Sequence, residues 1–565
     1  MAVPKRFPPL RLAVLNISVP IFLAIAAFAS PTVVVISPQS GGSPGSPIFY
    51  EAYATSANCA GGISAMRIYT APGVNAFTTN GAHVEHFITL APGSYSTVVQ
   101  AWDNCGGVAK VTVDLTVGST AGVSMFLPNQ PSAEWPVHVA ASAQSPSCSG
   151  GISALRIYTA SGVTPYTIDS NMLDAYVNLV PGNYNFTVQA WDNCGHIFKS
   201  QFAENVTTGS DAYLYGAANL KQANEFGIVE LGITSNGTLT NPNGSGNAPI
   251  FAPQSAPNTV TVDPGGWFVY ASSNVGIYGF QINRSNGALS PIPGSPFPLN
   301  QTLGDQGPPS IVMDPAGNFI YLVYGGGSAV DGLATYRIHR SSGALTWTGW
   351  ARTFGNLSSG CASVTGATTN FTGQFVYVNA LPNNCTNLET YGFRADPNRG
   401  FLNTQVPGSP YSVDTNASFG TVPVSTGRYL YLSNENGVTF GFSLVPGTGA
   451  LTQVTGSPFP TASIFRLFAD WKTRVLWAWE ASLLQVLTID PASGALSGGS
   501  AFGQSLNSLV EDHTAHFVFI SYFGVPDVSA WAVSSSGTLT RLNMLTISSS
   551  TGSVGSIAVT RKNPI

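Results

Sequence analysis

The sequence predicts an all-β protein in which two tandem sandwiches precede a seven-bladed β-propeller closed by its C-terminal strand. Two internal repeats indicate this organisation: a unit of 43 to 57 residues recurs through the C-terminal two thirds, and a unit of 89 residues occurs twice before it. Only 8% of the 565 residues are charged, whereas 61 are Gly and 39 are Pro, a composition typical of strands and turns. The net charge of -5 disfavours nucleic acid as a partner.

The N-terminal residues 1–29 have the pattern of a secretory signal peptide. Basic residues precede an apolar run that ends in Ala27-Phe28-Ala29, the small-x-small form of a signal-peptidase site. An uncleaved anchor is the alternative, but the run is short for a membrane span and Pro20 interrupts it. We therefore expect an extracellular, periplasmic or cell-surface protein with no stable membrane insertion after cleavage.

The shorter repeat predicts two sandwich modules, at 32–118 and 121–208. The segment 59–70 returns almost unchanged as 148–159, and each unit offers several short alternating strands. The two units resemble bacterial immunoglobulin-like or fibronectin-like modules, on the basis of a Leu-x-Pro-Gly-x-Tyr corner at 90–95 and its copy 89 residues later. In antibody domains the two cysteines lie within strands and their disulfide crosses the core. Here the cysteines follow the strands, which favours a disulfide at one end of the sandwich.

The six cysteines are expected to pair, because an exported chain permits oxidation and both modules keep the same 46-residue spacing. The remaining two cysteines fall in propeller loops that emerge on one face, so they too should form a disulfide. The predicted pairs are Cys59–Cys105, Cys148–Cys194 and Cys361–Cys385.

A metal site is not expected. Cys-x₂-Cys pairs are absent. The segment His83-Val84-Glu85-His86 offers two imidazoles, but residues three apart on a strand point to opposite faces, so a solvated loop or strand edge is the expectation there. The loops of the propeller hold no repeated acidic set for calcium, and no cofactor is predicted.

The longer repeat fills residues 210–565, and each unit reads as four short strands, a to d. A hairpin such as Asp263-Pro264-Gly265-Gly266 joins strands a and b, and a Gly-x-Leu turn joins c and d, where Gly supplies positive φ. The first unit lacks an innermost strand, which 555–560 can supply, so the C-terminal strand should complete blade one. The seven turn glycines are Gly237, Gly287, Gly343, Gly400, Gly449, Gly494 and Gly537.

This region resembles the seven-bladed lactonase family, which includes bacterial 6-phosphogluconolactonases, and more loosely the surface-layer propellers with YVTN-type repeats. The resemblance spans all seven units and lies in the Asp-Pro-x-Gly-x-Phe-Val-Tyr hairpin, the Ser-x-Gly-x-Leu turn and the Pro-Gly-Ser-Pro-Phe tails. These residues build turns and packing, so they indicate architecture rather than activity.

The a–b and c–d turns should share one face, which leaves the d–a and b–c loops as the expected functional face. His339, His513 and His516 fall on the turn face, so no propeller histidine reaches the functional one. Polar residues of the functional face are Lys221, Glu225, Asp305, Asp331, Arg352, Glu435, Glu480 and Asp527. The candidates for a catalytic site are Arg352, Glu435 and Glu480.

Two functions are compatible with these features. The first is a monomeric secreted or envelope-associated binding protein whose propeller recognises a glycan or a protein. The alternative, implied by the family resemblance, is a lactone hydrolase. We favour the first, because export separates the chain from cytoplasmic phosphosugars and the functional face lacks histidine, and we expect no hydrolysis of 6-phosphogluconolactone.

Overall fold

A computed structural model describes residues 30–561 with short gaps. Every regular element in the described part is a β-strand, which confirms the all-β prediction. Within the same residues, no helix has the length and apolar character needed to cross a membrane. The undescribed positions after residue 30 are 58, 60, 161–162, 221–225, 243–249, 252–254, 301–308, 326–330, 356–362, 382–387, 415–422, 435–436, 462–463, 465, 481–482, 504, 548–550 and 562–565.

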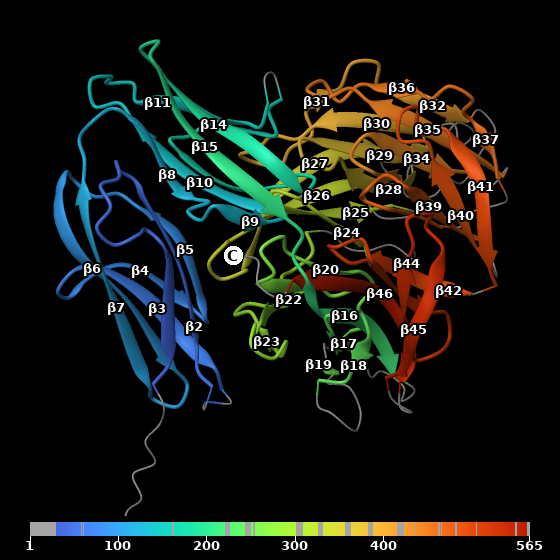
Figure 1. Ribbon diagram of the computed structural model, residues 1–565, viewed down its shortest axis with the longest axis horizontal. Helices are drawn as coiled ribbons and strands as arrows, with labels where there is room; N and C mark the ends of the chain where they lie inside the picture. The colour runs from blue at the N-terminus through green and yellow to red at the C-terminus, as the bar shows by residue number, and fades with distance from the viewer. Residues whose placement is uncertain are drawn as a thin grey trace, which may run out of the picture.

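The first module consists of two sheets around one core (Figure 1). Apolar side chains alternate inward along its strands, as Met66 and Ile68 do on one sheet and Phe49 on the other, and all three are fully buried. The three-stranded sheet has the order β1 (Thr32–Ser37), β2 (Ile48–Thr55) and β5 (His83–Ile88). The four-stranded sheet has the order β4 (Val74–Asn80), β3 (Ile63–Ala71), β6 (Gly93–Asp103) and β7 (Val108–Val117).

The second module repeats this plan, with Leu155, Ile157 and Phe186 in its core. One sheet has the order β13 (Met172–Val177), β10 (Val137–Gln144) and β8 (Gly122–Leu127). The other has the order β12 (Tyr166–Ile168), β11 (Ile152–Tyr158), β14 (Gly182–Asp192), β15 (Ile197–Thr207) and β9 (Ser132–Glu134). The predicted disulfides Cys59–Cys105 and Cys148–Cys194 are both formed, each beside the ends of strands.

The described residues from Asp211 to Arg561 form seven sheets. The first contains β46 (Thr551–Arg561), β16 (Asp211–Leu220), β17 (Phe226–Ile233), β18 (Leu239–Thr240) and β19 (Ile250–Phe251). The second contains β20 (Val260–Val262), β21 (Phe268–Ser272), β22 (Ile277–Ile282) and β23 (Leu289–Pro291). The third contains β24 (Ser310–Met313), β25 (Phe319–Tyr324), β26 (Asp331–Ile338) and β27 (Leu345–Gly355).

The remaining four sheets follow the same a-to-d order. The fourth contains β28 (Ser363–Thr369), β29 (Phe375–Leu381), β30 (Leu388–Arg394), β31 (Thr404–Gln405) and β32 (Tyr411–Asp414). The fifth contains β33 (Val424–Ser425), β34 (Tyr429–Ser433), β35 (Val438–Leu444), β36 (Leu451–Gln453) and β37 (Phe459–Pro460). The sixth contains β38 (Arg466–Ala469), β39 (Val475–Glu480), β40 (Leu483–Ile489) and β41 (Leu496–Phe502). The seventh contains β42 (Leu506–Glu511), β43 (Phe517–Tyr522), β44 (Asp527–Val533) and β45 (Leu539–Thr546).

The innermost strands meet around a common centre, as in a β-propeller. Strand β46 contacts both β42 and β20, and contacts continue from β20 through β24, β28 and β33 to β38. Strand β46 also pairs antiparallel with β16, with Leu214 opposite Val559 and Gly216 opposite Ile557. The prediction that the C-terminal strand completes the first sheet is therefore confirmed.

The repeated Tyr and Gly are explained by a contact between neighbouring sheets. The hydroxyl of Tyr270 on a second strand donates to the carbonyl of Gly343, in the Gly-x-Leu turn of the next sheet, at 2.7 Å. Gly343 has φ +69°, and a Cβ there would lie 2.4 Å from Phe268. Only glycine fits this position without displacing a buried ring. The same bond occurs from Tyr215 to Gly287, Tyr377 to Gly449 and Tyr431 to Gly494.

Candidate functional site

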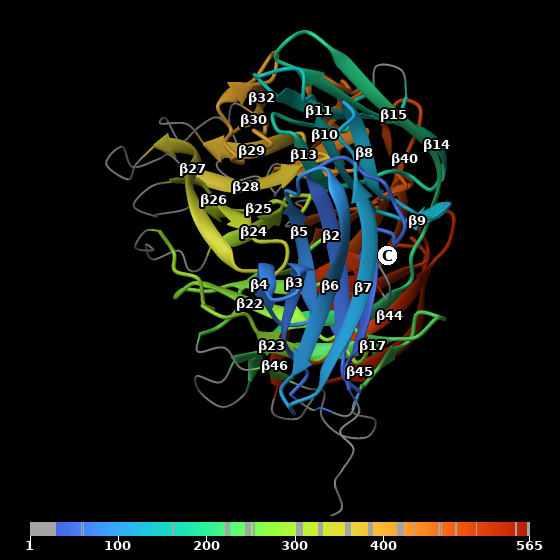
Figure 2. The ribbon, with the colours of Figure 1, turned by 90° about the vertical axis from the view of Figure 1, so that its left-hand side faces the viewer.

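Both modules pack against one face of the propeller, and Figure 2 shows them in front of it. The contacts involve the a–b and c–d turns: Tyr176 N–H donates to Ala316 O at 3.2 Å, and Asn178 Nδ2 donates to Phe371 O at 2.7 Å. The first module reaches the same face, because Glu85 N–H donates to Ser341 Oγ at 2.9 Å. The turn face is thus covered.

Trp135 of the second module occupies the centre of that face. Its ring lies 5.8 Å from Phe371, 4.8 Å from Trp471 and 5.2 Å from His513, between ring centroids. These three residues come from the a–b turns of the fourth, sixth and seventh sheets. A side chain that contacts inner turns of three different sheets must stand at the mouth of the central channel. Trp135 therefore covers this mouth, and only 8% of its surface is exposed.

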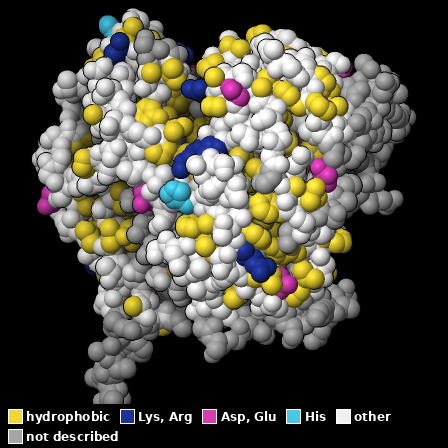
Figure 3. Space-filling model, turned by 45° about the vertical axis from the view of Figure 1, so that its right-hand side comes forward, with side chains coloured by type: hydrophobic (Ala, Val, Ile, Leu, Met, Phe, Trp, Pro, Cys, Tyr) yellow, Lys and Arg dark blue, Asp and Glu magenta, His cyan; other side chains and the backbone are white. Residues whose placement is uncertain are grey.

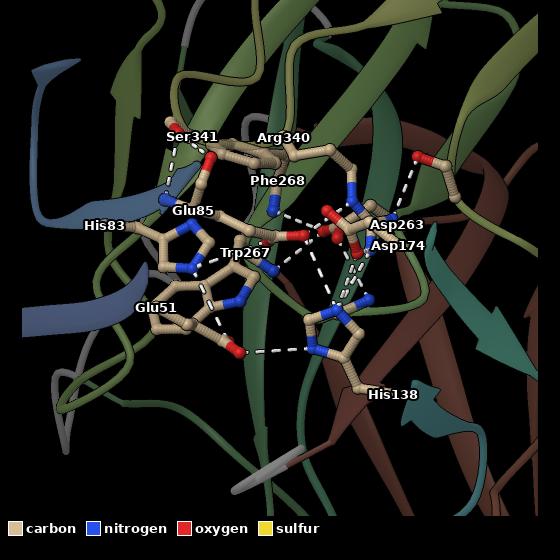
Figure 4. A network of polar contacts seen from close by, with 12 residues as sticks. Glu51, His83, Glu85, His138, Asp174, Asp263, Trp267, Phe268, Arg340 and Ser341 are labelled. Carbon is tan, nitrogen blue, oxygen red and sulfur yellow. Dashed lines mark hydrogen bonds and ion pairs between the residues drawn. The ribbon is translucent and has the colours of Figure 1, made fainter. Parts of the chain in front are cut away.

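A buried cluster of ionisable side chains lies where the two modules and the propeller meet (Figure 4). We call this set of residues the junction cluster. The first module places two carboxylates side by side, because Glu51 on β2 is directly paired with Glu85 on β5. The cluster comprises Glu51, His83 and Glu85 of the first module, His138 and Asp174 of the second, and Arg340 of the propeller.

Arg340 joins the two modules to the propeller. Its Nε donates to Glu85 Oε1 at 2.8 Å, and its Nη2 donates to Asp174 Oδ1 at 3.0 Å. His138 Nε2 also lies 2.8 Å from Asp174 Oδ1, and His138 Nδ1 lies 3.2 Å from Glu51 Oε2. Each carboxylate of the cluster therefore has a cation or an imidazole beside it.

Burial and the neighbouring charges shift the pKa values of these groups in opposite directions. Burial alone would lower the pKa of His138, but the charge of Glu51 and the contact with Asp174 raise that pKa to about 10. Burial would raise the pKa of Asp174, but Arg340 and His138 outweigh burial and lower that pKa. For Glu85 burial prevails over Arg340, and its pKa is well above the ordinary value. Glu85 therefore favours its neutral form and Asp174 its charged form.

His83 is held by rings rather than by hydrogen bonds. Its imidazole stacks on Trp267 of the propeller, with centroids 4.0 Å apart and planes at 13°. Arg284 lies over the same indole, 4.2 Å from its centroid. Burial lowers the pKa of His83, so its neutral form is favoured.

A cleft of about 790 Å³ opens above the junction cluster, and its floor includes Glu85, Asp174 and Arg340. We call it the junction cleft. On its wall, Phe77 and His86 stack with centroids 3.9 Å apart and planes at 12°. Other lining residues are Thr78, Thr79, Asn80, Met172, Arg337 and His339. Charged side chains are sparse on the face that Figure 3 shows, in keeping with the composition.

A smaller cavity of about 270 Å³ lies between the second module and the propeller. Its lining is polar and charged from both sides, with Arg156 and Asp169 from the module and Gln374, Arg394 and Asp396 from the propeller. Both cavities thus lie along the boundary between modules and propeller, where ligand sites are often found.

No protein-family profile matches this sequence, and no curated protein is similar to it. Solved structures with a similar fold include a periplasmic gluconolactonase of Pseudomonas aeruginosa, at 15% identity and a TM-score of 0.47 over 62% of this chain and 99% of that one. Another is a putative 6-phosphogluconolactonase of Bacteroides fragilis, at 13% identity and a TM-score of 0.46 over 62% and 98%. These neighbours are lactonase-like β-propellers. At such identity the likeness concerns fold alone.

Two of the three predicted catalytic candidates lie in the described residues, on the third and the sixth sheets. Arg352 lies on β27, the outermost strand of the third sheet, with its guanidinium 5.3 Å from the ring centroid of Phe393. Glu480 ends β39 in the sixth sheet and is half-buried. Glu435 lies outside the described residues, as do Cys361 and Cys385, so their pairing stays a prediction.

Of the other polar residues of that face, Asp331 is buried, at 1% exposure. Among the described residues neither of its carboxylate oxygens has a hydrogen-bond partner, and burial raises its pKa to about 6. Asp527 instead accepts a hydrogen bond from Thr546 at 2.6 Å. Lys221, Glu225 and Asp305 lie outside the described residues.

The expectation for 83–86 was correct in one respect and wrong in another. His83 and His86 do lie on opposite faces of β5, as strand geometry requires. His83 and Glu85 are nevertheless buried rather than solvated, because the second module and the propeller cover that face. The sequence held one signal of this: Glu51 sits in an alternating apolar strand at a position where its repeat copy is Ala140.

Proposed function

We propose that this chain is an extracytoplasmic, monomeric binding protein that holds a glycan in the junction cleft. The proposal takes 1–29 as a signal peptide, 32–118 and 121–208 as immunoglobulin-like modules, and 210–565 as a seven-bladed propeller. Two-sheet cores in each module and seven described sheets around one centre support this division. Two disulfides are compatible with an oxidising compartment outside the cytoplasm.

The junction cleft is the observation that carries the binding role. Its volume of about 790 Å³ falls within the range of roughly 300–1,000 Å³ that small-molecule sites occupy, and it lies between three parts of one molecule. A sugar presents an apolar ring face and a rim of hydroxyls. The Phe77–His86 stack suits the ring face, and the amide of Asn80 and the guanidinium of Arg337 suit the hydroxyls.

Glycan binding is tested with the mature full-length chain on an oligosaccharide array, followed by calorimetry on any sugar retained. We expect Phe77→Ala to weaken binding at least tenfold, because it removes the aromatic wall of the cleft. Trp347→Ala is the matched control, since Trp347 is an exposed aromatic on β27 outside the cleft lining. Equal affinity of both variants for the same sugar would place the site elsewhere.

A lactone hydrolase is the second candidate, and Asp331 is the observation in its favour. A buried carboxyl with a pKa near 6 is suited to act as a general base near neutral pH. Arg352 enters on β27, the strand paired with β26 that carries Asp331, and supplies a cation on the same sheet. If this function is correct, Asp331→Asn abolishes turnover of a sugar lactone, whereas Asp527→Asn retains it. Absence of turnover across a panel of sugar lactones would leave binding alone.

A further inference from the structure

Three donor atoms of the junction cluster surround one point. Glu51 Oε1 and Glu85 Oε2 each lie 3.7 Å from His83 Nε2, and the three residues offer ligand atoms that all lie within 4.8 Å of one another. An ion at the centre of such a triangle stands roughly 2.1–2.4 Å from each atom, close to zinc–nitrogen and zinc–oxygen bonds of about 2.0–2.2 Å.

Two of these residues are fully buried and make no hydrogen bond through their side chains in the described part of the chain. Glu51 and His83 are both 0% exposed. Within the described part of the chain, neither oxygen of Glu51 and neither ring nitrogen of His83 makes a hydrogen bond. Glu51 Oε2 forms an ion pair with His138 Nδ1 at 3.2 Å, whereas Oε1, the oxygen that faces His83, lies 3.7 Å from His83 Nε2. Leaving such groups unsatisfied is costly, so a missing partner is indicated.

The neighbouring triad already contains a cationic side chain. Glu85, His138 and Asp174 also lie close together, but Arg340 already donates to Glu85 Oε1 and Asp174 Oδ1 from within the cluster. A metal ion there would meet a guanidinium. In the first triad Arg340 contacts Glu85 through Oε1, at 2.8 Å, whereas Glu85 Oε2 is the oxygen that faces His83. Among the described residues, neither Glu51 nor His83 has an arginine or lysine within ion-pair distance.

We propose that Glu51, His83 and Glu85 bind a divalent transition-metal ion, with His138 as fourth donor. Imidazole and carboxylate ligands in this number suit Zn²⁺. His138 lies beside the triad, with Nδ1 3.2 Å from Glu51 Oε2, while its Nε2 contacts Asp174. The ion would join the two modules, and its role is structural and separate from any ligand of the junction cleft.

Metal content tests the proposal directly. The mature chain without a histidine tag is incubated with Zn²⁺, passed over a chelating resin and analysed by plasma mass spectrometry. We expect about one zinc per chain, and a melting temperature about 5 °C lower after removal of the ion by a strong chelator. Glu51→Gln and His83→Gln should each retain less than a tenth of the zinc. His86→Gln is the control and should retain all of it, because His86 lies on the other face of β5.

A second measurement covers the case in which the variants fail to fold. X-ray absorption of the zinc-loaded wild-type chain should show a first shell of nitrogen and oxygen with imidazole back-scattering and no sulfur. A wild-type chain that holds less than 0.1 zinc, or zinc that survives both substitutions in folded protein, overturns the proposal. The charges would then be balanced by protons on His138 and Glu85.

Discussion

The two modules are copies of one unit, and some of their differences lie where they face each other and the propeller. Both modules have a disulfide at one end, with the same hydrogen bond beside it. Ser56 Oγ donates to Asp103 at 2.7 Å, and Ser145 Oγ donates to Asp192 at 2.7 Å. At the junction, however, Glu51 corresponds to Ala140, 89 residues later. The residues that surround the disulfide are thus repeated, whereas Glu51 at the junction is not.

One position at the junction carries a carboxylate in both modules. Glu85 and Asp174 are equivalent in the two copies, and the same Arg340 contacts both. Their surroundings still differ: His138 lies 2.8 Å from Asp174 but 3.5 Å from Glu85. A pair of equivalent carboxylates on one guanidinium therefore has opposite pKa shifts.

The largest expected effect comes from neutralising these two carboxylates separately. In chelator-treated protein at pH 7, Asp174→Asn should lower the free energy of unfolding by about 3–5 kcal/mol, because it leaves Arg340 and His138 short of a counter-charge. Glu85→Gln should cost less than Asp174→Asn, because burial raises the pKa of Glu85 and so disfavours its charged form. Urea unfolding measures both, and equal losses would contradict the assigned asymmetry.

The pH dependence of that difference has a defined sign. The folded-state pKa of Asp174 is lowered, so its contribution is present above its unfolded value of about 4 and disappears as pH falls through the folded value. The folded-state pKa of Glu85 is raised, so its contribution decreases as pH rises above about 4. The penalty of Asp174→Asn should therefore shrink in acid.

The second effect should be equal in the two modules. Each disulfide closes a loop with the same sequence separation of 46 residues, for which loop entropy predicts about 4 kcal/mol. We compare a variant with Cys59 and Cys105 replaced by alanine against one with Cys148 and Cys194 replaced, using hydrogen exchange resolved by module. If the two variants lose stabilities that differ by more than about 1 kcal/mol, then packing on the propeller, rather than the disulfide, limits the opening of the second module.

The sequence predicted the repeated features of the modules and the propeller, but not the contacts between them. The repeat of 89 residues predicted both disulfides. The first propeller unit lacks an innermost strand of its own, and this predicted the pairing of β46 with β16. Such features depend on residues near in sequence or repeated along it. The junction cluster depends on the docking of three separate parts, and strand alternation cannot reveal which polar position another part will cover. Glu51 and His83 were therefore not recognised as buried partners.

A third comparison concerns one core position of the last strand in each module. Leu115 on β7 is 3% exposed, and its counterpart on β15 is Glu204, also 3% exposed, with a pKa raised to about 7 by burial. Glu204→Leu should stabilise the protein by about 1–3 kcal/mol at pH 8. The raised pKa means that folding takes up a proton between pH 4.5 and about 7, so wild-type stability falls across this range as pH rises. The gain should therefore be small at pH 4, and a gain independent of pH would mean that Glu204 is not buried as a neutral acid.

The smallest expected effect is at a contact that both modules share on their outer sheets. Arg67 lies over Trp102 and Arg156 over Trp191, with guanidinium-to-centroid distances of 5.2 Å and 5.1 Å. Both arginines also donate from Nε to a threonine on the neighbouring strand, at 2.8 Å and 3.1 Å. Partly exposed contacts of this kind contribute about 0.5–1 kcal/mol each, so Arg67→Met and Arg156→Met should cost the same small amount in thermal melts.

Only Arg156 faces a second part of the molecule, since it lines the 270 Å³ cavity together with Asp169 and Asp396. Among the described residues it makes no ion pair with either aspartate, so the cavity should add nothing to its contribution. If Arg156→Met instead lowers the free energy of unfolding by at least about 1 kcal/mol more than Arg67→Met, then contacts across the cavity stabilise the packing of the second module on the propeller. In that case salt should reduce the difference, because charges across a solvent-filled gap are screened.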